Sequence, residues 1–300
     1  MPDPVISIRG LRMSYGDTEA VRGIDLEVER GEVFAFLGPN GAGKTTTVEI
    51  LEGYRKRTGG EVSVLGEDPQ SAGRSWRQRI GIVLQSSRLD PYLTVRESLA
   101  LYAGYFHTPR PIDEVIALVG LEQEADKRAR RLSGGQQRRL DVGMALVGDP
   151  ELLFLDEPTT GFDPSARRAA WDVIAGLRDL GKTVFLTTHY MDEAQRLADR
   201  VTIIAAGEIV ARGTPEDLGD RENQPATIRY RADGEDIVVE TTTPVQTLHE
   251  LTGAALAKGE ELEGLEVTRP TLEDVYLELT GENGAQGESG AVAGKREAAS

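Results

Sequence analysis

Short, continuous runs of apolar residues recur along the N-terminal and middle parts of the chain. Residues 33–37 (VFAFL), 152–155 (LLFL) and 183–188 (TVFLTT) each have the length of a strand and contain no charged residue. Such runs are typical of strands in a sheet that is covered on both faces. Within residues 4–28, apolar and polar residues alternate around a turn at Tyr15-Gly16-Asp17, which predicts antiparallel strands.

Segments with helical spacing of apolar residues separate these runs. The pattern predicts helices over residues 94–106 and 111–131, after Ser133, near 164–180 and near 191–198. Strand, loop and helix therefore alternate through the middle of the chain. This alternation favours an α/β fold in which helices cover a mixed, mostly parallel sheet.

The C-terminal part follows a different pattern. Two alternating runs, at residues 227–231 and 236–240, flank Asp233-Gly234, which is a strong signal for a β-hairpin. A helix near 244–257, a strand near 265–269 and a helix near 271–279 would complete a small α+β module. The predicted domains are residues 4–218, residues 226–280 and a disordered tail at residues 281–300, which is rich in Gly, Ala, Ser and Glu.

Composition limits the possible classes of protein. The chain of 300 residues contains no cysteine, so neither a disulfide framework nor a thiolate metal site is expected. Its three histidines (His107, His189 and His249) are far apart, which argues against a histidine metal cluster. No apolar stretch approaches the ~18–20 residues that span a bilayer, and the first residues do not resemble a signal peptide. We therefore expect a cytoplasmic protein.

Charge is negative and unevenly distributed. The net charge is −16, and residues 215–300 alone hold 19 acidic and 7 basic residues. Because phosphate contacts need Lys and Arg, this balance argues against a nucleic-acid partner. The acidic end is either a solvated surface that aids solubility or a contact for a basic partner.

A glycine-rich segment follows the first apolar run. Gly38-Pro39-Asn40-Gly41-Ala42-Gly43-Lys44-Thr45 matches the pattern G-x-x-x-x-G-K-[ST] between a predicted strand and a predicted helix. Glycines allow backbone N–H groups to approach a phosphate closely, and the helix that begins at Lys44 points its positive end at the anion. Lys44 is expected to reach the β- and γ-phosphates, and the Thr45 hydroxyl is expected to bind Mg²⁺. We predict that residues 38–46, including Thr46, bind ATP.

Acidic residues end the second apolar run. Asp156 and Glu157 lie at the carboxyl end of a predicted parallel strand, where ligands of such sheets usually bind. Asp156 is placed to hold Mg²⁺, and Glu157 is placed to deprotonate an attacking water. If the phosphate loop were absent, these two carboxylates would be explained equally well as solvated side chains at the end of a strand. His189, after the third run, is then expected to contact the γ-phosphate.

The segment Leu132-Ser133-Gly134-Gly135-Gln136 resembles the signature motif of ABC ATPases. The order of motifs also matches that family: phosphate loop, Gln85, this segment, Asp156-Glu157, Asp163 and His189. The resemblance covers residues 4–216 and implies a P-loop ATPase core, an antiparallel β subdomain and a helical signature subdomain.

The resemblance assigns further roles. Tyr15 matches the aromatic residue on which adenine stacks, and Asp163 matches the loop that communicates between two sites. Gln85 matches the glutamine that senses Mg²⁺ and contacts the membrane partner. Phe162 departs from the leucine that is usual in the family. The expected catalytic residues are Glu157, His189 and Gln85, and the expected metal ligands are Thr45, Gln85 and Asp156.

The family also implies partners. The signature residues Ser133, Gly134, Gly135 and Gln136 would close on ATP held by a second copy of the chain or by a homologous ATPase subunit. Ser133 caps a helix, and the glycines expose N–H groups at its positive end. A separate transmembrane permease would dock near residues 86–110. Leu89, Leu93, Tyr102 and Tyr105 would either contact it or form a helical core.

The ending around residues 270–281 is similar to that of drug-exporter subunits of the daunorubicin-resistance type. The expected function is therefore ATP hydrolysis that powers transport, at the cytoplasmic face of the membrane, of a drug, an antibiotic or a lipid-like molecule. The alternative is a soluble, non-transport ABC ATPase that acts in translation or DNA repair.

Overall fold

The computed structural model describes residues 3–85, 89–218, 225–232, 235–259, 262–268 and 276–277. The chain divides into two compact units, Met1–Thr214 and Pro215–Ser300. The predicted boundary at residue 218 falls after the short helix α8 (Pro215–Leu218), whereas the two units divide before it. None of the helices in the described part of the chain has both the length and the apolar character needed to cross a membrane.

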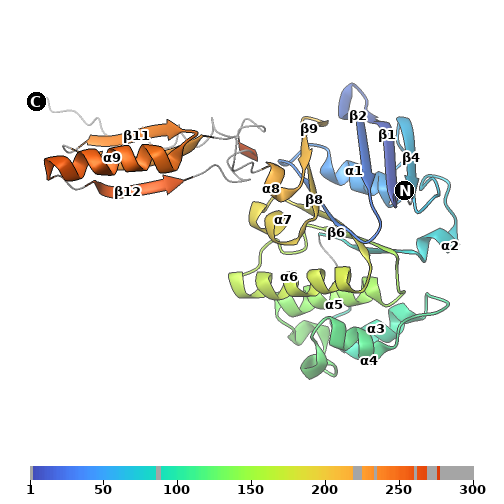
Figure 1. The fold of residues 1–300 in the computed structure, drawn as a ribbon. Coiled ribbons are helices and arrows are strands. Elements are labelled where there is room, and N and C mark those ends of the chain that lie inside the picture. The colour runs from blue at the N-terminus through green and yellow to red at the C-terminus, as the bar shows by residue number, and fades with distance from the viewer. Residues whose placement is uncertain are drawn as a thin grey trace, which may run out of the picture. The chain divides into compact units, whose positions relative to one another are not determined.

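The first unit is built on a six-stranded sheet with the order β5-β6-β7-β3-β8-β9 (Figure 1). All neighbouring strands are parallel except the last pair, β8 and β9, which is antiparallel. The predicted mixed, mostly parallel sheet is therefore confirmed. The strands are β3 (Val33–Leu37), β5 (Ile80–Val83), β6 (Leu152–Asp156), β7 (Thr183–Thr188), β8 (Arg200–Ala205) and β9 (Glu208–Gly213).

Apolar side chains fill both faces of this sheet. The ring of Phe185 lies 5.4–5.7 Å, centroid to centroid, from the rings of Phe34, Phe36 and Phe154. These four rings belong to one core, and the alternate residues of the same strands, such as Leu153 and Leu186, belong to a second. Since successive side chains of a strand point to opposite faces, a run such as VFAFL must be apolar throughout.

The first core is closed by an antiparallel sheet with the order β2-β1-β4 and by helix α1. These elements are β1 (Ile6–Tyr15), β2 (Thr18–Val28), β4 (Gly59–Val64) and α1 (Lys44–Leu51), and the short helix α2 (Arg74–Arg77) follows. Trp76 of α2 is fully buried, and its indole N–H donates to the carbonyl of Val64 over 2.8 Å. The sequence pattern did not predict β4, β5, β9 or α2.

The second core is closed by helices, which Figure 1 shows on the side of the central sheet opposite to the antiparallel sheet. They are α3 (Val95–Ala103), α4 (Ile112–Leu118), α5 (Gly134–Leu146) and α6 (Pro164–Asp179), with α7 (Met191–Leu197) after β7. The single helix predicted over residues 111–131 is wrong. Gly120, with φ of 63°, follows the end of α4, and only two 3₁₀ turns come after it (Glu122–Glu124 and Ala129–Arg131).

The second unit contains an antiparallel sheet with the order β11-β10-β12 and helix α9. Its elements are β10 (Ala226–Ala232), β11 (Glu235–Thr241), α9 (Pro244–Lys258) and β12 (Glu263–Thr268), so the predicted hairpin and the predicted α+β composition are present. The turn Asp233-Gly234 and the predicted tail at residues 281–300 lie outside the described residues. So does the helix predicted near 271–279, apart from residues 276–277.

Candidate nucleotide-binding and hydrolysis site

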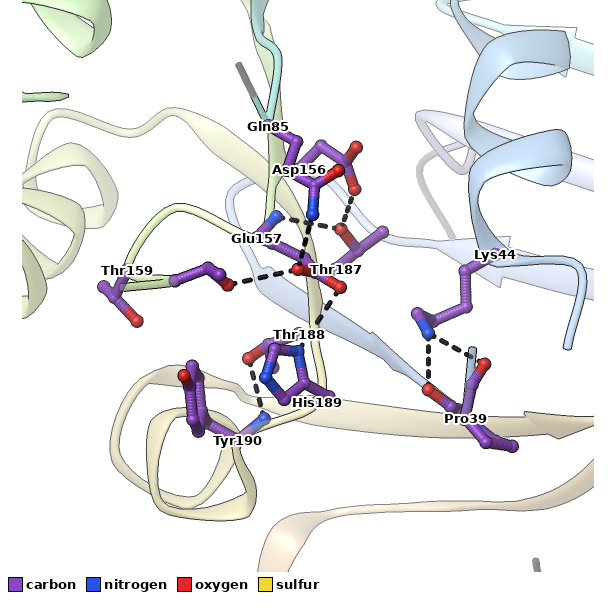
Figure 2. Close-up of polar contacts among 12 residues, drawn as sticks. Pro39, Lys44, Gln85, Asp156, Glu157, Thr159, Thr187, Thr188, His189 and Tyr190 are labelled. Atoms are coloured by element: carbon purple, nitrogen blue, oxygen red, sulfur yellow. Dashed lines mark hydrogen bonds and ion pairs between the residues drawn. The ribbon is translucent and has the colours of Figure 1, made fainter. Parts of the chain in front are cut away.

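Sheet topology brings three segments with polar side chains to one edge. Strands β6, β7 and β3 are consecutive parallel neighbours, so their carboxyl ends lie together. Asp156 and Glu157 end β6, His189 follows β7, and the phosphate loop follows β3. Figure 2 shows these side chains facing a common space. Open α/β sheets bind ligands at such an edge.

The phosphate loop turns sharply into α1. Gly43 has φ of 106°, and a Cβ atom at this position would lie 2.6 Å from the carbonyl oxygen of Ala20, so only glycine fits. Lys44 is 6% exposed, and its ammonium donates to the carbonyls of Gly38 and Pro39 within the loop (Figure 2). The loop therefore encloses a positive charge next to the N-terminus of α1, which is a geometry suited to an anion.

Tyr15 lies at the end of β1 beside the first turn of α1. Its hydroxyl is 3.4 Å from the Thr46 hydroxyl, and the Arg55 guanidinium lies 5.2 Å from its ring centroid. Arg55 is held in turn by Glu49 at 2.5 Å. Because 43% of Tyr15 is exposed, ring surface remains on which a base could stack.

The carboxylate of Glu157 is held on three sides. Gln85 Nε2 donates to Oε2 over 3.0 Å, the Thr160 hydroxyl donates to the same oxygen over 3.1 Å, and His189 Nδ1 lies 3.3 Å from Oε1. Its own N–H bonds the Thr187 carbonyl and hydroxyl, and its φ of 45° is unusual for a non-glycine residue. The backbone and its neighbours thus fix the direction of this carboxylate.

The predicted metal ligands have suitable chemistry. The Thr187 hydroxyl donates to Asp156 Oδ1 over 2.5 Å and so orients that carboxylate, while Thr45 is an exposed hydroxyl in the first turn of α1. No cluster of three or more acidic or histidine ligands occurs among the described residues. Mg²⁺ bound to a nucleotide usually takes one or two protein oxygens together with phosphate and water, which this donor set can supply.

The signature segment begins α5. Ser133 accepts the N–H of Gln136 over 3.2 Å, and the Gln136 side chain accepts the N–H of Ser133 over 2.9 Å, which completes a capping box. Asp163 caps α6 in a similar way, through the N–H groups of Ser165 and Ala166. Gly134 lines a cavity of about 480 Å³ together with Gln85 and Glu157.

Sequence reasoning missed Arg138, which joins the parts of this site. Its buried guanidinium donates to the backbone carbonyls of Leu84, Asp156, Glu157 and Pro158. Burial lowers the pKa of Arg138 below its ordinary value, and the charge of Asp141 opposes this effect. A single arginine in a helix carries no pattern that would have identified it.

Two buried carboxyls beside the site were also missed. Burial, with the charges of Asp156 and Glu49, raises the pKa of Glu52 to about 8. Burial likewise raises the pKa of Glu193, although the side chains of Thr159 and Trp171 donate to its Oε1. Glu52 directly follows α1 and Glu193 lies in α7, and the sequence of neither helix indicates what covers these carboxyls.

The fold and the site together define a P-loop nucleotide-hydrolysing protein, and comparison with known proteins specifies the class. A family model described as "ABC transporter" matches residues 21–160. The Nod factor export ATP-binding protein I of Cupriavidus pinatubonensis is 38% identical, over 92% of this chain and 91% of its own. The daunorubicin resistance ATP-binding protein DrrA3 of Streptomyces coeruleorubidus is 37% identical, over 94% of this chain and 98% of its own.

A solved structure agrees with these relatives. The ATP-binding cassette MJ0796, a dimer in a post-hydrolysis state bound to ADP and Pi, is 25% identical with a TM-score of 0.62, over 70% of this chain and 98% of its own. The chain therefore belongs to the ABC transporter family, as an ATP-binding subunit that hydrolyses ATP. The family and the enzyme class predicted from the sequence are confirmed.

Proposed function

We propose that this chain powers the export of a drug-, antibiotic- or lipid-like molecule by a separate membrane-spanning subunit, at the cytoplasmic face of the membrane. The direction of transport is supported by two relatives that match nearly the whole chain, one named for Nod factor export and one for daunorubicin resistance. The match extends over the small second unit as well as the ATPase unit.

One observation carries the proposed mechanism, namely the fixed carboxylate of Glu157. It lies at the edge of the sheet where the phosphate loop follows β3. Gln85, Thr160 and His189 hold this carboxylate, so it is oriented before any substrate arrives. In our proposal Glu157 accepts a proton from the attacking water, and His189 contacts the γ-phosphate. Lys44 exchanges its loop carbonyls for phosphate oxygens, and Tyr15 stacks on adenine.

Thr45, Asp156 and Gln85 would hold Mg²⁺. Bound there, Mg²⁺ would neutralise charge on the β- and γ-phosphates, as it does in other P-loop ATPases. The Thr187 hydroxyl keeps Asp156 turned for this role.

The second anion site belongs to the proposed dimer. The N-terminus of α5, with Ser133, Gly134, Gly135 and Gln136, would close on the γ-phosphate held by a second copy. ATP contacts both copies only in the closed state, so ATP favours closure and its hydrolysis reopens the pair. Asp163, which caps α6, would lie at the contact between the two copies.

A groove of about 470 Å³ beside α3 supports docking of the membrane subunit. It is lined mainly by apolar and aromatic side chains, among which Tyr54 and Tyr102 are 70% and 41% exposed. Of the residues predicted for this contact, Tyr102 and Tyr105 are exposed, whereas Leu89 packs against the helical core and Leu93 is half-buried.

Replacement of Glu157 by Gln tests the mechanism. The Glu157→Gln variant should bind ATP, lower ATP turnover by roughly 10²–10⁴-fold and accumulate as a closed dimer with ATP, because the amide cannot accept the proton. Steady-state phosphate release and size-exclusion chromatography with ATP measure both effects. The exposed Glu122→Gln variant should behave as the unaltered chain, and rapid phosphate release by Glu157→Gln would contradict the assignment.

Affinity purification of the tagged chain from detergent-solubilised native membranes tests the transport role. A co-purifying polypeptide with several transmembrane segments, whose presence raises ATP turnover, is the expected result. Recovery with ribosomes or DNA would instead favour the non-transport alternative. Loading of membrane vesicles that contain both chains then separates export from import.

A further inference from the structure

We propose that Tyr190 and Arg167 are positioning residues for His189: the Tyr190 ring, held by the Arg167 guanidinium, fixes the imidazole against Glu157. This inference rests on the proposed roles of His189 and Glu157 in ATP hydrolysis. It adds Arg167, a residue of helix α6, to the groups that orient His189.

The contact between the two rings is close. The ring centroids of His189 and Tyr190 lie 4.1 Å apart with an interplanar angle of 39°. Figure 2 shows the imidazole lying between the Tyr190 ring and the Glu157 carboxylate. The His189 side chain is 38% exposed, and its one contact with Glu157, at 3.3 Å, does not by itself prevent rotation about χ2. A ring packed against the imidazole restricts that rotation.

Arg167 fixes the Tyr190 ring in turn. Its Cζ atom lies 4.1 Å from the Tyr190 ring centroid, and its Nη1 lies 3.2 Å from Asp192 Oδ2. The Nε atom of Arg167 is buried and makes no hydrogen bond to any of the described residues. The position of this guanidinium is thus set by the ring and by Asp192, at the expense of one of its donors.

The same face of α6 also contacts the start of α7. Trp171, one helical turn after Arg167, donates its indole N–H to Glu193 Oε1 over 3.0 Å. The Thr159 hydroxyl donates to the same oxygen over 2.9 Å, and Thr159 belongs to the loop that follows Glu157. Helix α6, the start of helix α7 and the loop after Glu157 are therefore tied to one another.

This arrangement places His189 under the control of the start of α6. The N–H of Arg167 bonds the carbonyl of Asp163, the residue that caps the helix. A displacement of Asp163 would therefore move Arg167, then the Tyr190 ring, and then the imidazole. A displacement of a reacting group by about 1 Å can change a rate by ~10²-fold, so a contact that positions His189 can affect turnover.

Histidine NMR tests the contact directly, because the chain contains only three histidines. In histidine-labelled full-length protein, Tyr190→Leu should remove the ring-current shift of the His189 ring protons, and Tyr190→Phe should keep it. Arg167→Met should reduce it. The signals of His107 and His249 serve as internal controls, and His189→Gln assigns the third signal. An unmoved His189 signal in Tyr190→Leu would overturn the proposal.

Steady-state kinetics test the positioning role. Tyr190→Leu should lower kcat about 10-fold with an unchanged KM for ATP, and Tyr190→Phe should restore it. The control is Tyr230→Leu, because Tyr230 lies in β10 of the second unit and has no place in the proposed nucleotide site. Equal losses in Tyr230→Leu and Tyr190→Leu, or an unchanged kcat in Tyr190→Leu, would overturn the role. Absence of turnover in the unaltered chain would overturn the proposed function, while NMR still decides the contact.

Discussion

Glu52 is an acidic residue that is buried beside the site. It is 5% exposed, and its Oε1 atom is buried without a hydrogen-bond partner in the described part of the chain. Burial and the nearby charges of Asp156 and Glu49 raise its pKa to about 8. The folded chain therefore keeps a proton on Glu52 at neutral pH that the unfolded chain, with a pKa near 4.5, has released.

This difference in protonation predicts how stability depends on pH. Between the two pKa values the folded state binds more protons, so the free energy of unfolding falls as pH rises from about 4.5 to about 8. Glu52→Gln removes this dependence. Its melting temperature should equal that of the unaltered chain near pH 5 and exceed it near pH 8.5. At the higher pH its free energy of unfolding should be larger by on the order of a few kcal/mol.

Thermal unfolding at a series of pH values measures the effect of Glu52→Gln. The exposed Glu122→Gln variant should follow the unaltered chain throughout. A constant difference between Glu52→Gln and the unaltered chain at all pH values would mean that Glu52 does not titrate in this range.

Residues at strand ends could be predicted, whereas residues that join distant segments could not. Asp156, Glu157 and His189 each lie at the end of an apolar run or just after it, and a parallel sheet places such positions at one edge. Arg138 meets carbonyls from residues on either side of the helical region, from Leu84 to Pro158. Such a contact depends on packing between elements, which periodicity along the chain does not encode.

Among the elements, α3 and α5 begin with the same capping geometry, which allows a controlled test of the signature segment. Thr94 caps α3 with Glu97 at N3, and Ser133 caps α5 with Gln136 at N3. Loss of either cap should cost about 1 kcal/mol of stability. Only the cap of α5 lies in the segment proposed to bind the phosphate held by a second copy.

Replacement of each cap by alanine should therefore separate stability from function. Ser133→Ala and Thr94→Ala should lower the melting temperature by similar amounts, about 2–4 °C for a unit of this size. Ser133→Ala alone should also weaken ATP-dependent dimer formation in the Glu157→Gln background. Equal dimer formation in both variants, measured by analytical ultracentrifugation, would leave Ser133 with a structural role alone.

The elements that the sequence predicted are those with a long or uniform pattern. Strands β3, β6 and β7 are apolar throughout because cores lie on both of their faces. Strand β5 has only 4 residues, and β4 (GGEVSV) mixes polar and apolar residues. Their pairing with β6 and β1 is a long-range contact without a local signal. The helix predicted at residues 111–131 failed for a visible reason, since Gly120 is a helix-ending residue within that pattern.

At the scale of the whole molecule, the ATPase unit contains its own cores. Both hydrophobic clusters consist of residues between Val5 and Ile209, so none comes from the second unit. A chain truncated after Leu218 should therefore fold cooperatively and bind ATP. Thermal unfolding with and without MgATP measures this, and the full-length chain is the control. Loss of the ATP-dependent shift on truncation would show that the second unit completes the nucleotide site.

The position of β3 in the sheet has a consequence for synthesis of the chain. This strand leaves the ribosome early, whereas its neighbours β7 and β8 end only at Thr188 and Ala205. Until they emerge, the segment VFAFL has no pairing partner, and the loop after it has no rigid base. The nascent chain thus carries an exposed apolar segment through most of its translation, which is a state that chaperones bind. The phosphate loop follows β3, so ATP can assist folding only after β3 has paired with β7 and β8.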